Sequence, residues 1–464
     1  MTTMRLASLL TALAVAGCAT APALDASRLP ATPAHFKEGG QPAAAAPDEA
    51  QPQGPWWKAF ADPVLDDLVA RAGGGNASLQ VAAARLAQAR AAAGAAGAAL
   101  SPQLGLHAGA SRVGGIVDGT LAPASTRAAA GAALSYEVDL WGKLARASDA
   151  AALDARSREG LLEATRLLVQ AEVAQAYLAI RALDAERGLV EGTLAANRET
   201  LAITEGRFRA GDVAELDVAR ARAEVAATES EALALDRRRA ALENALAVLV
   251  GESASGFALA PGEWTTRLPA IPAGIPATVL ARRPDVSAAR DALLAARQRV
   301  GVAQAAWFPD VALTADGGYA SAGLSDLLKW SARAWGVGAL LSLPVLDGGR
   351  REAGVQDATA RLDESIARYR EQVLVSLREV EDQLSALRLL ASQSRAQARA
   401  VDAAARATDL SNARYLGGFV SQLELLDARR IELGNRRQAL QVRSAQYQAT
   451  VGLVRALGGG WGGA

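Results

Sequence analysis

The chain has 464 residues and no formal net charge, because 49 lysine and arginine residues balance 49 aspartate and glutamate residues. Without a positive excess, the composition gives no indication of nucleic-acid binding. One cysteine and two histidines exclude internal disulfides and thiolate metal clusters, and they remove most histidine-based metal sites and catalytic triads. We therefore expect a protein that is not an enzyme and has no metal site.

Residues 1–17 have the composition of a secretory signal, with a positive charge at Arg5 followed by a short apolar run. The run is too short to stay in a bilayer as a spanning helix. Residues 15–18 read VAGC and resemble a bacterial lipobox, in which the cysteine is acylated and becomes the mature N-terminus. We expect a lipid on Cys18, each buried CH₂ contributing roughly 0.8 kcal/mol to membrane binding. The alternative is an ordinary signal peptide followed by a chance cysteine.

Residues 18–58 are predicted to form a lipid-anchored linker. From Ala19 to about Gln53 the chain is rich in alanine and proline and has few large apolar residues, which is typical of an extended segment. We expect this linker to hold the lipid anchor away from the folded body. Ala19, in place of an aspartate directly after the cysteine, fits the usual rule for sorting of such lipoproteins to the outer membrane.

The two halves of the chain repeat each other at a constant offset. The stretch RFRAGDVAELDVARARA (207–223) is matched by RYLGGFVSQLELLDARR (414–430), and residues 76–102 match 283–309 without a gap. One shift that persists over most of the chain indicates a duplicated structural unit. The predicted boundaries are a first repeat at 59–260, a linker at 261–276, a second repeat at 277–457 and a glycine-rich tail at 458–464.

Each repeat is predicted to contain a helix, two strands, a long helix, a turn and another long helix. Between residues 128 and 140, and again between 333 and 345, apolar residues alternate with small or polar ones. This period of two is the signal of a strand with one wet face. The offset carries the apolar face of one segment onto that of the other. The weaker alternating partners lie at 104–111 and 311–320.

Four strands of about ten residues are long enough to cross a membrane when tilted. Four strands cannot close a barrel, and open sheet edges are not tolerated in lipid, so several chains must pool their strands. Tyr136, Trp141 and Trp307 fall near predicted strand ends, where the aromatic girdles of membrane strands lie. The alternative is a pair of soluble hairpins packed on helices.

Long helices are predicted from residue 143 to about 209 and from 350 to about 416, because both stretches lack proline and are rich in strong helix formers. About 65 helical residues measure about 100 Å, so a bundle, tube or stalk is expected. A heptad seam in the last helix predicts a supercoiled helix pair. The seam residues are Leu426, Leu433, Leu440, Tyr447 and Val454.

A glycine turn separates the two long helices of each repeat. Gly211, and the pair Gly417 and Gly418, allow the chain to turn through a left-handed conformation. Helix is expected to resume directly afterwards, at Leu216 and Leu423. Each repeat is therefore predicted to form a helical hairpin with its tip furthest from the strands.

The sequence resembles the outer-membrane efflux factors of the TolC type, and in particular their lipoprotein branch, the OprM and NodT family. The resemblance covers nearly the whole mature chain, with the matching pieces in the expected order. These pieces are the lipobox at Cys18, DPVLDDL (62–68), SYEVDLWGKLARA (135–147), LARRPDV (280–286), LPVLDGGRR (343–351), LLDARR (425–430) and ALGGGW (456–461).

The resemblance implies a mainly α fold with a β part. Long helices would form an α-helical barrel in the periplasm, and four transmembrane strands per chain would complete a 12-stranded barrel in a homotrimer. The same resemblance implies the outer-membrane channel of a tripartite efflux system in a Gram-negative bacterium. Such a channel is a passive exit duct for drugs and other small molecules, with an inner-membrane RND pump and a periplasmic membrane-fusion adaptor as partners.

The resemblance implies no cofactor beyond covalent N-acyl and S-diacylglycerol lipid on Cys18, and outer-membrane lipid is the other expected contact. Two other functions remain open at this stage. The same tube would serve as the outer-membrane duct of a type I protein secretion system. A periplasmic lipoprotein scaffold of coiled helices, without a channel, is the second alternative.

The two glycine turns resemble the hairpin tips at which the adaptor docks in this family. The alternative is that these residues only form turns. The residues expected at the docking surface are Arg207, Gly211, Leu216, Arg414, Gly418 and Leu423.

The second turn also resembles the periplasmic gate of the OprM-like branch. Its pattern of leucine, three residues, aspartate, two residues and arginine falls on Leu423, Asp427 and Arg430. Three leucines in a trimer would form an apolar ring, and the charged pair would latch neighbouring tips. Solvated charges or pairing three residues apart within one helix are the alternative. Arg220 and Ala223 occupy the charged positions in the first repeat, so the latch is not duplicated.

Overall fold

The computed structural model describes most of the chain, and its residues fall into two compact units. The first unit comprises 1–30, 84–160 and 287–372, and the second comprises 31–83, 161–286 and 373–464. Both units draw on both repeats. The predicted signal segment, Cys18 and the tail from residue 460 lie outside the described residues. Those described are 26–30, 33, 36–38, 54–117, 120–269, 280 and 282–459.

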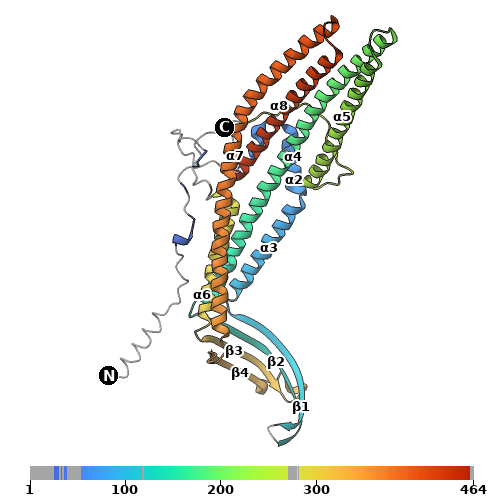
Figure 1. Ribbon diagram of the computed structural model, residues 1–464. Helices are drawn as coiled ribbons and strands as arrows, with labels where there is room; N and C mark the ends of the chain where they lie inside the picture. Colours follow the sequence, from blue (N-terminus) through green and yellow to red (C-terminus); the bar gives the residue numbers. More distant parts are fainter. Residues whose placement is uncertain are drawn as a thin grey trace. The chain divides into compact units, whose positions relative to one another are not determined.

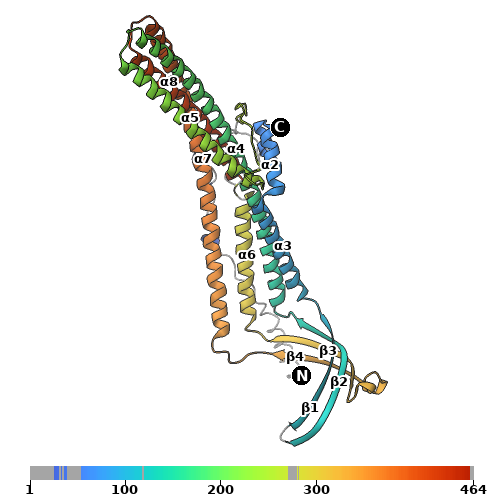
Figure 2. The same ribbon diagram turned by 90° about the vertical axis from the view of Figure 1, so that its right-hand side faces the viewer.

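A four-stranded antiparallel sheet lies in the first unit, in the order β1-β2-β3-β4 (Figure 2). The strands are β1 (Gln103–Val117), β2 (Thr120–Val138), β3 (Asp310–Ser321) and β4 (Arg333–Ser342). The prediction of four strands is therefore confirmed. The expected length of about ten residues is wrong for the first pair, since β1 has 15 residues and β2 has 19.

The extra length of the first pair comes from the hairpin itself. The ladder between β1 and β2 continues outward to the pair Val117 and Thr120. Residues beyond the alternating pattern become strand because the partner strand satisfies their backbone N–H and C=O groups. A pattern of side chains does not record this contribution of the backbone.

The register of the sheet places the predicted apolar positions on one face, because residues directly opposite each other in an antiparallel pair share a face. One row runs through Leu104, Leu134, Ala315 and Val337. We call this side the apolar sheet face and the other the polar sheet face. The large residues of the apolar sheet face are Leu104, Leu106, Leu134, Tyr136, Val138, Val311, Leu313, Trp335, Val337 and Leu341.

Long helices follow the second strand of each repeat, as predicted. α4 (Lys143–Arg209) and α7 (Arg350–Leu416) each have 67 residues (Figure 1). Both are continuous, and residues from each belong to both units. Among the described residues, no helix combines the length and the apolar character needed to cross a membrane.

An aspartate begins each of these helices. The Asp139 carboxylate accepts the backbone N–H groups of Leu144 at 3.1 Å and Ala145 at 2.8 Å. The Asp347 carboxylate accepts those of Gly349 at 3.1 Å and Arg351 at 3.2 Å. A carboxylate here satisfies free N–H groups and opposes the positive end of the helix dipole. A hydrogen bond from the Arg351 side chain lowers the pKa of Asp347 further.

In the first unit, α6 (Pro284–Ala305) packs against the first turns of α7. In the second unit, α2 (Pro63–Gly75) and the start of α3 (Ala77–Ala98) meet α4 and α5 (Glu215–Val250). α8 (Gln422–Ala456) completes this core. Fully buried side chains of the second unit are Phe60, Leu65, Tyr177, Leu178, Ile180 and Leu246.

The predicted heptad seam lies on the inner face of α8. Leu426, Tyr447 and Val454 are buried, while Leu433 and Leu440 are half-buried. Tyr447 and Val454 belong to the same core as residues of α4, so α8 packs on α4 as well as on α7. Gln397 of α7 donates to the Asn435 carbonyl of α8 at 3.0 Å and supports the helix pair.

The duplication is visible in how each repeat closes. The Asn76 side chain, just before α3, donates to the Leu249 carbonyl in the last turn of α5 at 2.8 Å. The Arg283 side chain, just before α6, donates to the Ala456 carbonyl in the last turn of α8, also at 2.8 Å. Both members of the second contact lie 207 residues after those of the first, the offset found in the sequence. Each bond satisfies a carbonyl that the end of a helix leaves free.

The predicted linker at 18–58 is not free along its whole length. Phe36 is 3% exposed and packs in a cluster with Leu280, Val380 and Leu453. In the first unit, Arg28 pairs with Asp363 of α7 at 2.8 Å. These residues of the segment thus contact the folded body, since a large aromatic side chain gains free energy by leaving water.

Candidate functional site

Both hairpin tips, α4 to α5 and α7 to α8, turn through a left-handed glycine as predicted. Gly211 has φ of 85° and Gly418 has φ of 76°, whereas Gly417 is not left-handed. The backbone N–H of the next residue reaches back to the carbonyl of Arg207 at 2.9 Å in the first tip and of Arg414 at 2.8 Å in the second. This is a Schellman cap, which satisfies the last carbonyls of the helix. The second helix begins one residue earlier than expected in both hairpins.

Replacing Gly211 or Gly418 by alanine is expected to loosen the corresponding tip, because a left-handed backbone costs an L-residue roughly 1 kcal/mol. Hydrogen–deuterium exchange of tip amides should become about fivefold faster. Gly434→Ala, within α8 and without positive φ or a neighbour within 4 Å of the added methyl group, is the matched control. It should leave exchange unchanged or slow it. Equal effects of all three substitutions would contradict the strain argument.

The side chains predicted for docking differ in their surroundings. Arg207 lies with its guanidinium 5.1 Å from the centre of the Tyr415 ring, so it joins the first tip to the second. Arg414 is exposed, as are Leu216 (57%) and Leu423 (45%). The predicted set therefore contains one residue that holds the tips together and three that present side chains to the surroundings.

The tips also expose aromatic side chains that sequence reasoning missed. Phe208 in the first tip and Phe419 in the second are exposed, and the exposed Leu416 lies close to Phe419 along the chain. The offset would not have found them as a pair, since Phe208 corresponds to the buried Tyr415. Each tip thus carries its own apolar patch, and the two patches are not equivalent.

The three residues predicted for the gate all lie on the first turns of α8. Leu423, Asp427 and Arg430 are exposed in the single chain. Arg430 pairs with Asp427 at 3.6 Å, three residues apart on one helix, and also with Glu224 of α5. Hydrogen bonding to Glu224 raises the pKa of Arg430, whose guanidinium therefore stays charged.

Glu224 was not among the predicted residues, although the repeat places it next to the key position. Ala223 corresponds to Arg430, so Glu224 follows directly after the first-repeat equivalent of the arginine. The second repeat therefore supplies the cation and the first supplies a carboxylate one residue along. In a single chain, Arg430 is committed to both acids, and a latch between neighbouring chains stays a prediction.

Two further arginines tie α8 to the first hairpin. Arg429 is half-buried and donates to neutral acceptors, the Thr200 hydroxyl of α4 at 2.7 Å and the Ala196 carbonyl at 3.3 Å. Burial lowers the pKa of Arg429 from its usual value. Two helical turns further on than Arg430, Arg437 binds Glu186 of α4 at 2.7 Å and also pairs with Glu231 of α5. The two hairpins of a chain are thus connected at several levels.

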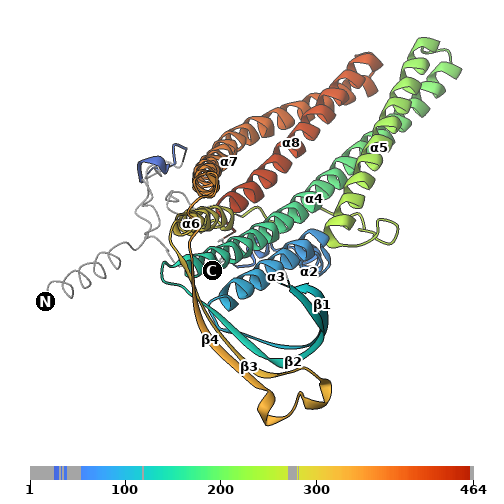
Figure 3. The ribbon, with the colours of Figure 1, turned by 90° about the horizontal axis from the view of Figure 1, so that it is seen from below.

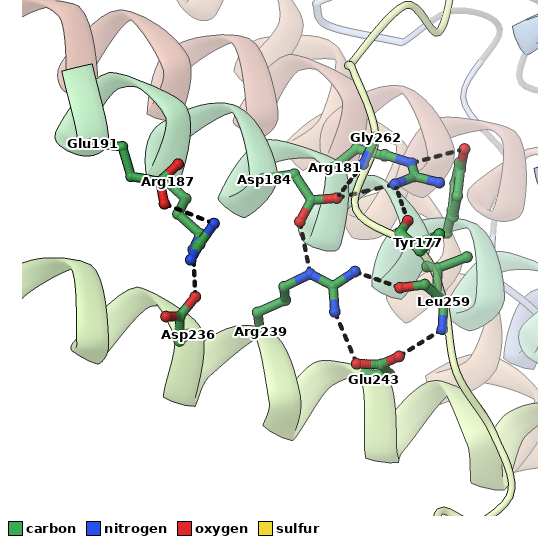
Figure 4. A network of polar contacts seen from close by, with 11 residues as sticks. Tyr177, Arg181, Asp184, Arg187, Glu191, Asp236, Arg239, Glu243, Leu259 and Gly262 are labelled. Atoms are coloured by element: carbon green, nitrogen blue, oxygen red, sulfur yellow. Dashed lines mark hydrogen bonds and ion pairs between the residues drawn. The ribbon is translucent and has the colours of Figure 1, made fainter.

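A buried ionic network lies in the second unit, at some distance in sequence from the tips (Figure 4). Asp184 of α4 accepts from Arg181 at 3.0 Å and from Arg239 of α5 at 2.7 Å. Arg239 also pairs with Glu243 at 2.8 Å and donates to the Leu259 carbonyl at 2.6 Å. The network therefore fixes the segment that follows α5 onto α4 and α5.

The same network continues to the start of α2. The Tyr177 hydroxyl donates to the Asp62 carboxylate at 2.8 Å, and the Thr266 hydroxyl donates to the same oxygen at 2.8 Å. Burial, countered in part by Arg181, raises the pKa of Tyr177 to about 12, so the hydroxyl remains a donor at neutral pH. The predicted linker at 261–276 is thus held in place over its described part, which ends at residue 269.

In the described ranges, no group of three or more histidine, cysteine, aspartate or glutamate side chains is arranged to hold a metal ion. The polar clusters consist instead of arginine paired with carboxylates, as in the Asp184 network and at Arg430. Such pairs hold helices together, and their contribution depends on burial.

Comparison with known proteins gives a consistent result for both repeats. Residues 68–252 and 275–459 each match the family model described as outer membrane efflux protein. The two matches are displaced by the same 207 residues as the sequence repeat, so the predicted internal duplication is confirmed. Together they cover well over half of the chain.

Individual proteins are similar over nearly the full length. The pyoverdine export outer membrane protein OpmQ of Pseudomonas aeruginosa is 34% identical over 415 residues, which cover 88% of this chain and 87% of OpmQ. The cation efflux system protein CusC of Escherichia coli K12 is 29% identical over 455 residues, covering 97% and 98%. The crystal structure of the outer membrane protein VceC from Vibrio cholerae superposes with a TM-score of 0.81 at 31% identity, covering 87% and 98%.

Proposed function

The chain belongs to the outer membrane efflux protein family, and on this premise we propose that three copies form one duct that carries small molecules out of the cell. Its place is the outer membrane of a Gram-negative bacterium, where it is the channel component of an efflux system. The fold predicted from the sequence, mainly α with a small β part and an internal duplication, is confirmed. The assembly into a trimer and the partners of that trimer are what we propose beyond this.

The observation that supports the membrane duct is the exposed apolar sheet face. Leu106 is 85% exposed, Trp335 79% and Val337 77% in the single chain. Moving such a side chain out of water gains about 1.5–3 kcal/mol, so the face requires an apolar environment. Thr314 and Asp316 lie on the polar sheet face, as suits the wall of a water-filled duct.

Within the part of the chain that the structure describes, the sheet has two unpaired edges, at β1 and at β4. An unpaired edge cannot remain in lipid, because its N–H and C=O groups would lack partners. In the proposed trimer, β1 of one chain pairs with β4 of the next, and twelve strands close the barrel. The long helices of the three chains form the α-barrel that continues the duct in the periplasm.

The relatives are named for different cargoes, pyoverdine export for OpmQ and cation efflux for CusC. Similar chains thus serve exporters of unlike solutes. We assign the selection of the solute to an inner-membrane RND pump and treat the present chain as a passive outlet. Lipid on Cys18, which lies outside the described residues, adds a second attachment to the membrane.

A periplasmic membrane-fusion adaptor is the proposed partner of the hairpin tips. Leu216, Leu423 and Arg414 are exposed there and supply apolar contact and positive charge. The Schellman caps at Gly211 and Gly418 fix the direction in which each tip points. Arg207, stacked on Tyr415, supports this surface from behind instead of contacting the adaptor.

The proposed gate uses the first turns of α8. Leu423 of three chains forms an apolar constriction, and Arg430 holds α8 in place through Glu224 and Asp427. The Arg430 side chain is exposed, so each pair is worth about 1 kcal/mol or less, and three copies act together. Removing the arginine frees the start of α8 to move outward.

The double variant Asp427→Ala/Arg430→Ala is expected to conduct better than the unchanged protein in planar bilayers. With the charged contacts removed, single-channel openings should become larger and longer, whereas the unchanged protein should open rarely and weakly. The measurement is single-channel conductance of purified protein. Asp357→Ala/Arg361→Ala, which removes an exposed pair at 2.8 Å on α7 well away from the tip, is the matched control and should behave like the unchanged protein.

Glu224→Ala distinguishes a gate held closed by contacts within one chain from a gate held closed by contacts between neighbouring chains. If this change alone reproduces the larger openings, Arg430 acts through the contact within its own chain. If it has no effect and the double variant opens, the latch joins neighbouring chains. Absence of current from all variants, in protein shown to be folded and inserted, would contradict the duct and favour a scaffold of helices.

A further inference from the structure

One end of the apolar sheet face carries an arginine and two aromatic residues. Arg333, the first residue of β4, pairs with Tyr319 of β3, and both lie on the apolar sheet face by register. The Arg333 guanidinium lies 3.3 Å from the centre of the Trp330 ring, and its Nε donates to the Trp330 carbonyl at 2.9 Å. These contacts place Trp330 on the side of the apolar face, although it belongs to the loop before β4.

The loop between β3 and β4, residues 322–332, extends beyond the ends of these two strands (Figure 3). It contains two short 3₁₀ turns, Leu324–Asp326 and Trp330–Ala332. Three large apolar side chains in it are exposed, Leu324 at 73%, Leu328 at 80% and Trp330 at 72%. A loop that remained in water would not gain from three such side chains.

The loop itself is neutral, and Arg333, the first residue of β4, gives this end of the sheet a net positive charge. Lys329 pairs with Asp326, and both side chains are largely exposed. The Arg333 side chain contacts the Trp330 ring and carbonyl, and among the described residues no carboxylate pairs with it. One positive charge is therefore left over beside an indole ring, a combination that suits the boundary between lipid and water.

The height of the apolar band also leaves room for the loop. From Val311 to Tyr319 the strand advances eight residues, or about 26 Å. At a tilt of about 40° this gives about 20 Å across the membrane, less than the apolar band of about 25 Å that such strands present. The opposite end is already marked, since Trp307 lies under Arg351 at 4.6 Å and Trp141 stacks on Phe308 at 4.7 Å. The remaining part of the apolar band therefore lies at the end of the sheet that carries the β3–β4 loop.

We propose that residues 322–333 form a lipid-binding collar. Leu324, Leu328 and Trp330 enter the outer leaflet of the membrane, while the Arg333 guanidinium and the Lys329 ammonium bind the phosphate of an anionic lipid headgroup. The inference rests on the proposed function, because it needs the apolar sheet face to lie in lipid. The loop joins the ends of β3 and β4 that are remote from α6 and α7, so it meets the leaflet opposite to the helices.

The position of the loop is tested by spin labels on single cysteines, since the chain has no cysteine other than Cys18. Labels at Leu328→Cys, Val337→Cys and Thr314→Cys are compared in full-length protein reconstituted in phosphatidylethanolamine and phosphatidylglycerol vesicles. Frequent collision of a label with oxygen indicates that the label lies in lipid, and frequent collision with a water-soluble nickel chelate indicates that it lies in water. We expect the label at position 328 to collide mainly with oxygen, as the label at 337 on the apolar sheet face does. The label at 314 on the polar sheet face should collide mainly with the nickel chelate.

The three positions also distinguish this inference from the proposed function. Nickel access at 328 with lipid contact at 337 would overturn the collar and leave the membrane duct in place. Nickel access at 337 would overturn both. Short distances between the 328 labels of different chains would place the loop over the mouth of the duct, or against a second copy, and would also overturn the collar.

The phosphate contact is tested by counting lipids retained on the protein in native mass spectrometry. The preference for phosphatidylglycerol over phosphatidylcholine of the same chain length should fall about fivefold for each cation removed, in Arg333→Gln and in Lys329→Gln. Arg361→Gln, an exposed arginine of α7, is the control and should keep the preference. An unchanged preference in Arg333→Gln would overturn the headgroup contact. Loss of the preference on adding inorganic phosphate alone would assign the site to free phosphate instead of lipid.

Discussion

Replacing Val337 by arginine is expected to reduce the amount of protein in the outer membrane by tenfold or more. Val337 lies at the middle of the apolar band of β4, directly opposite Ala315. An arginine facing lipid at that depth costs about 2–4 kcal/mol per chain, and three chains of the proposed trimer would each bear it. The measurement is the quantity of protein in the outer-membrane fraction after separation on a density gradient.

Leu340→Arg is the matched control for this change. Leu340 is in the same strand and is 63% exposed, but it lies on the polar sheet face, opposite Ala312. The same substitution there should leave the outer-membrane level close to that of the unchanged protein. Equal losses from both changes would indicate a general folding defect, and equal retention would contradict the placement of the apolar sheet face in lipid.

Replacing Asp184 by alanine is expected to cost about 3–5 kcal/mol, because it leaves the buried guanidinium groups of Arg181 and Arg239 without their shared acceptor. The segment after α5 should loosen, since Arg239 holds the Leu259 carbonyl. The measurement is hydrogen exchange at the Leu259 amide, which bonds Glu243 at 2.6 Å and should exchange at least about 100-fold faster in the variant.

Asp236→Ala provides the comparison for this effect. Asp236 pairs with Arg187 at 2.5 Å on the same two helices, but the Arg187 and Asp236 side chains are 38% and 43% exposed. A surface pair is worth about 0–1 kcal/mol, so exchange should change by no more than about fivefold. A similar effect of the two substitutions would show that burial does not set the strength of the Asp184 network.

Local patterns allowed most of the elements to be predicted. The long helices, the left-handed glycines at the tips and the alternation in β4 each depend on residues close together in sequence, where propensity and periodicity act. The offset between the repeats added long-range information, because it aligned Gly211 with Gly418. The lengths of β1 and β2 were underestimated because the hairpin ladder, and not side-chain alternation, carries their outer residues.

The candidate site was predicted only in part. The pattern of Leu423, Asp427 and Arg430 singled out the first turns of α8, where a gate stays a prediction, but it did not reveal Glu224 as a partner of Arg430. Which carboxylate meets which arginine across two helices depends on their rotation, and a single sequence does not record that rotation. The Asp184 network was missed for the same reason.

The contact between Arg28 and Asp363 limits how far the lipid proposed on Cys18 can reach. Ten residues separate Cys18 from Arg28, and a fully extended chain of that length covers at most about 35 Å. Asp363 lies 13 residues beyond the start of α7, or about 20 Å along the helix. In the proposed lipidated protein, this segment is long enough for an acyl chain at Cys18 to enter the bilayer surface near the strand ends and too short to let that surface move away from them.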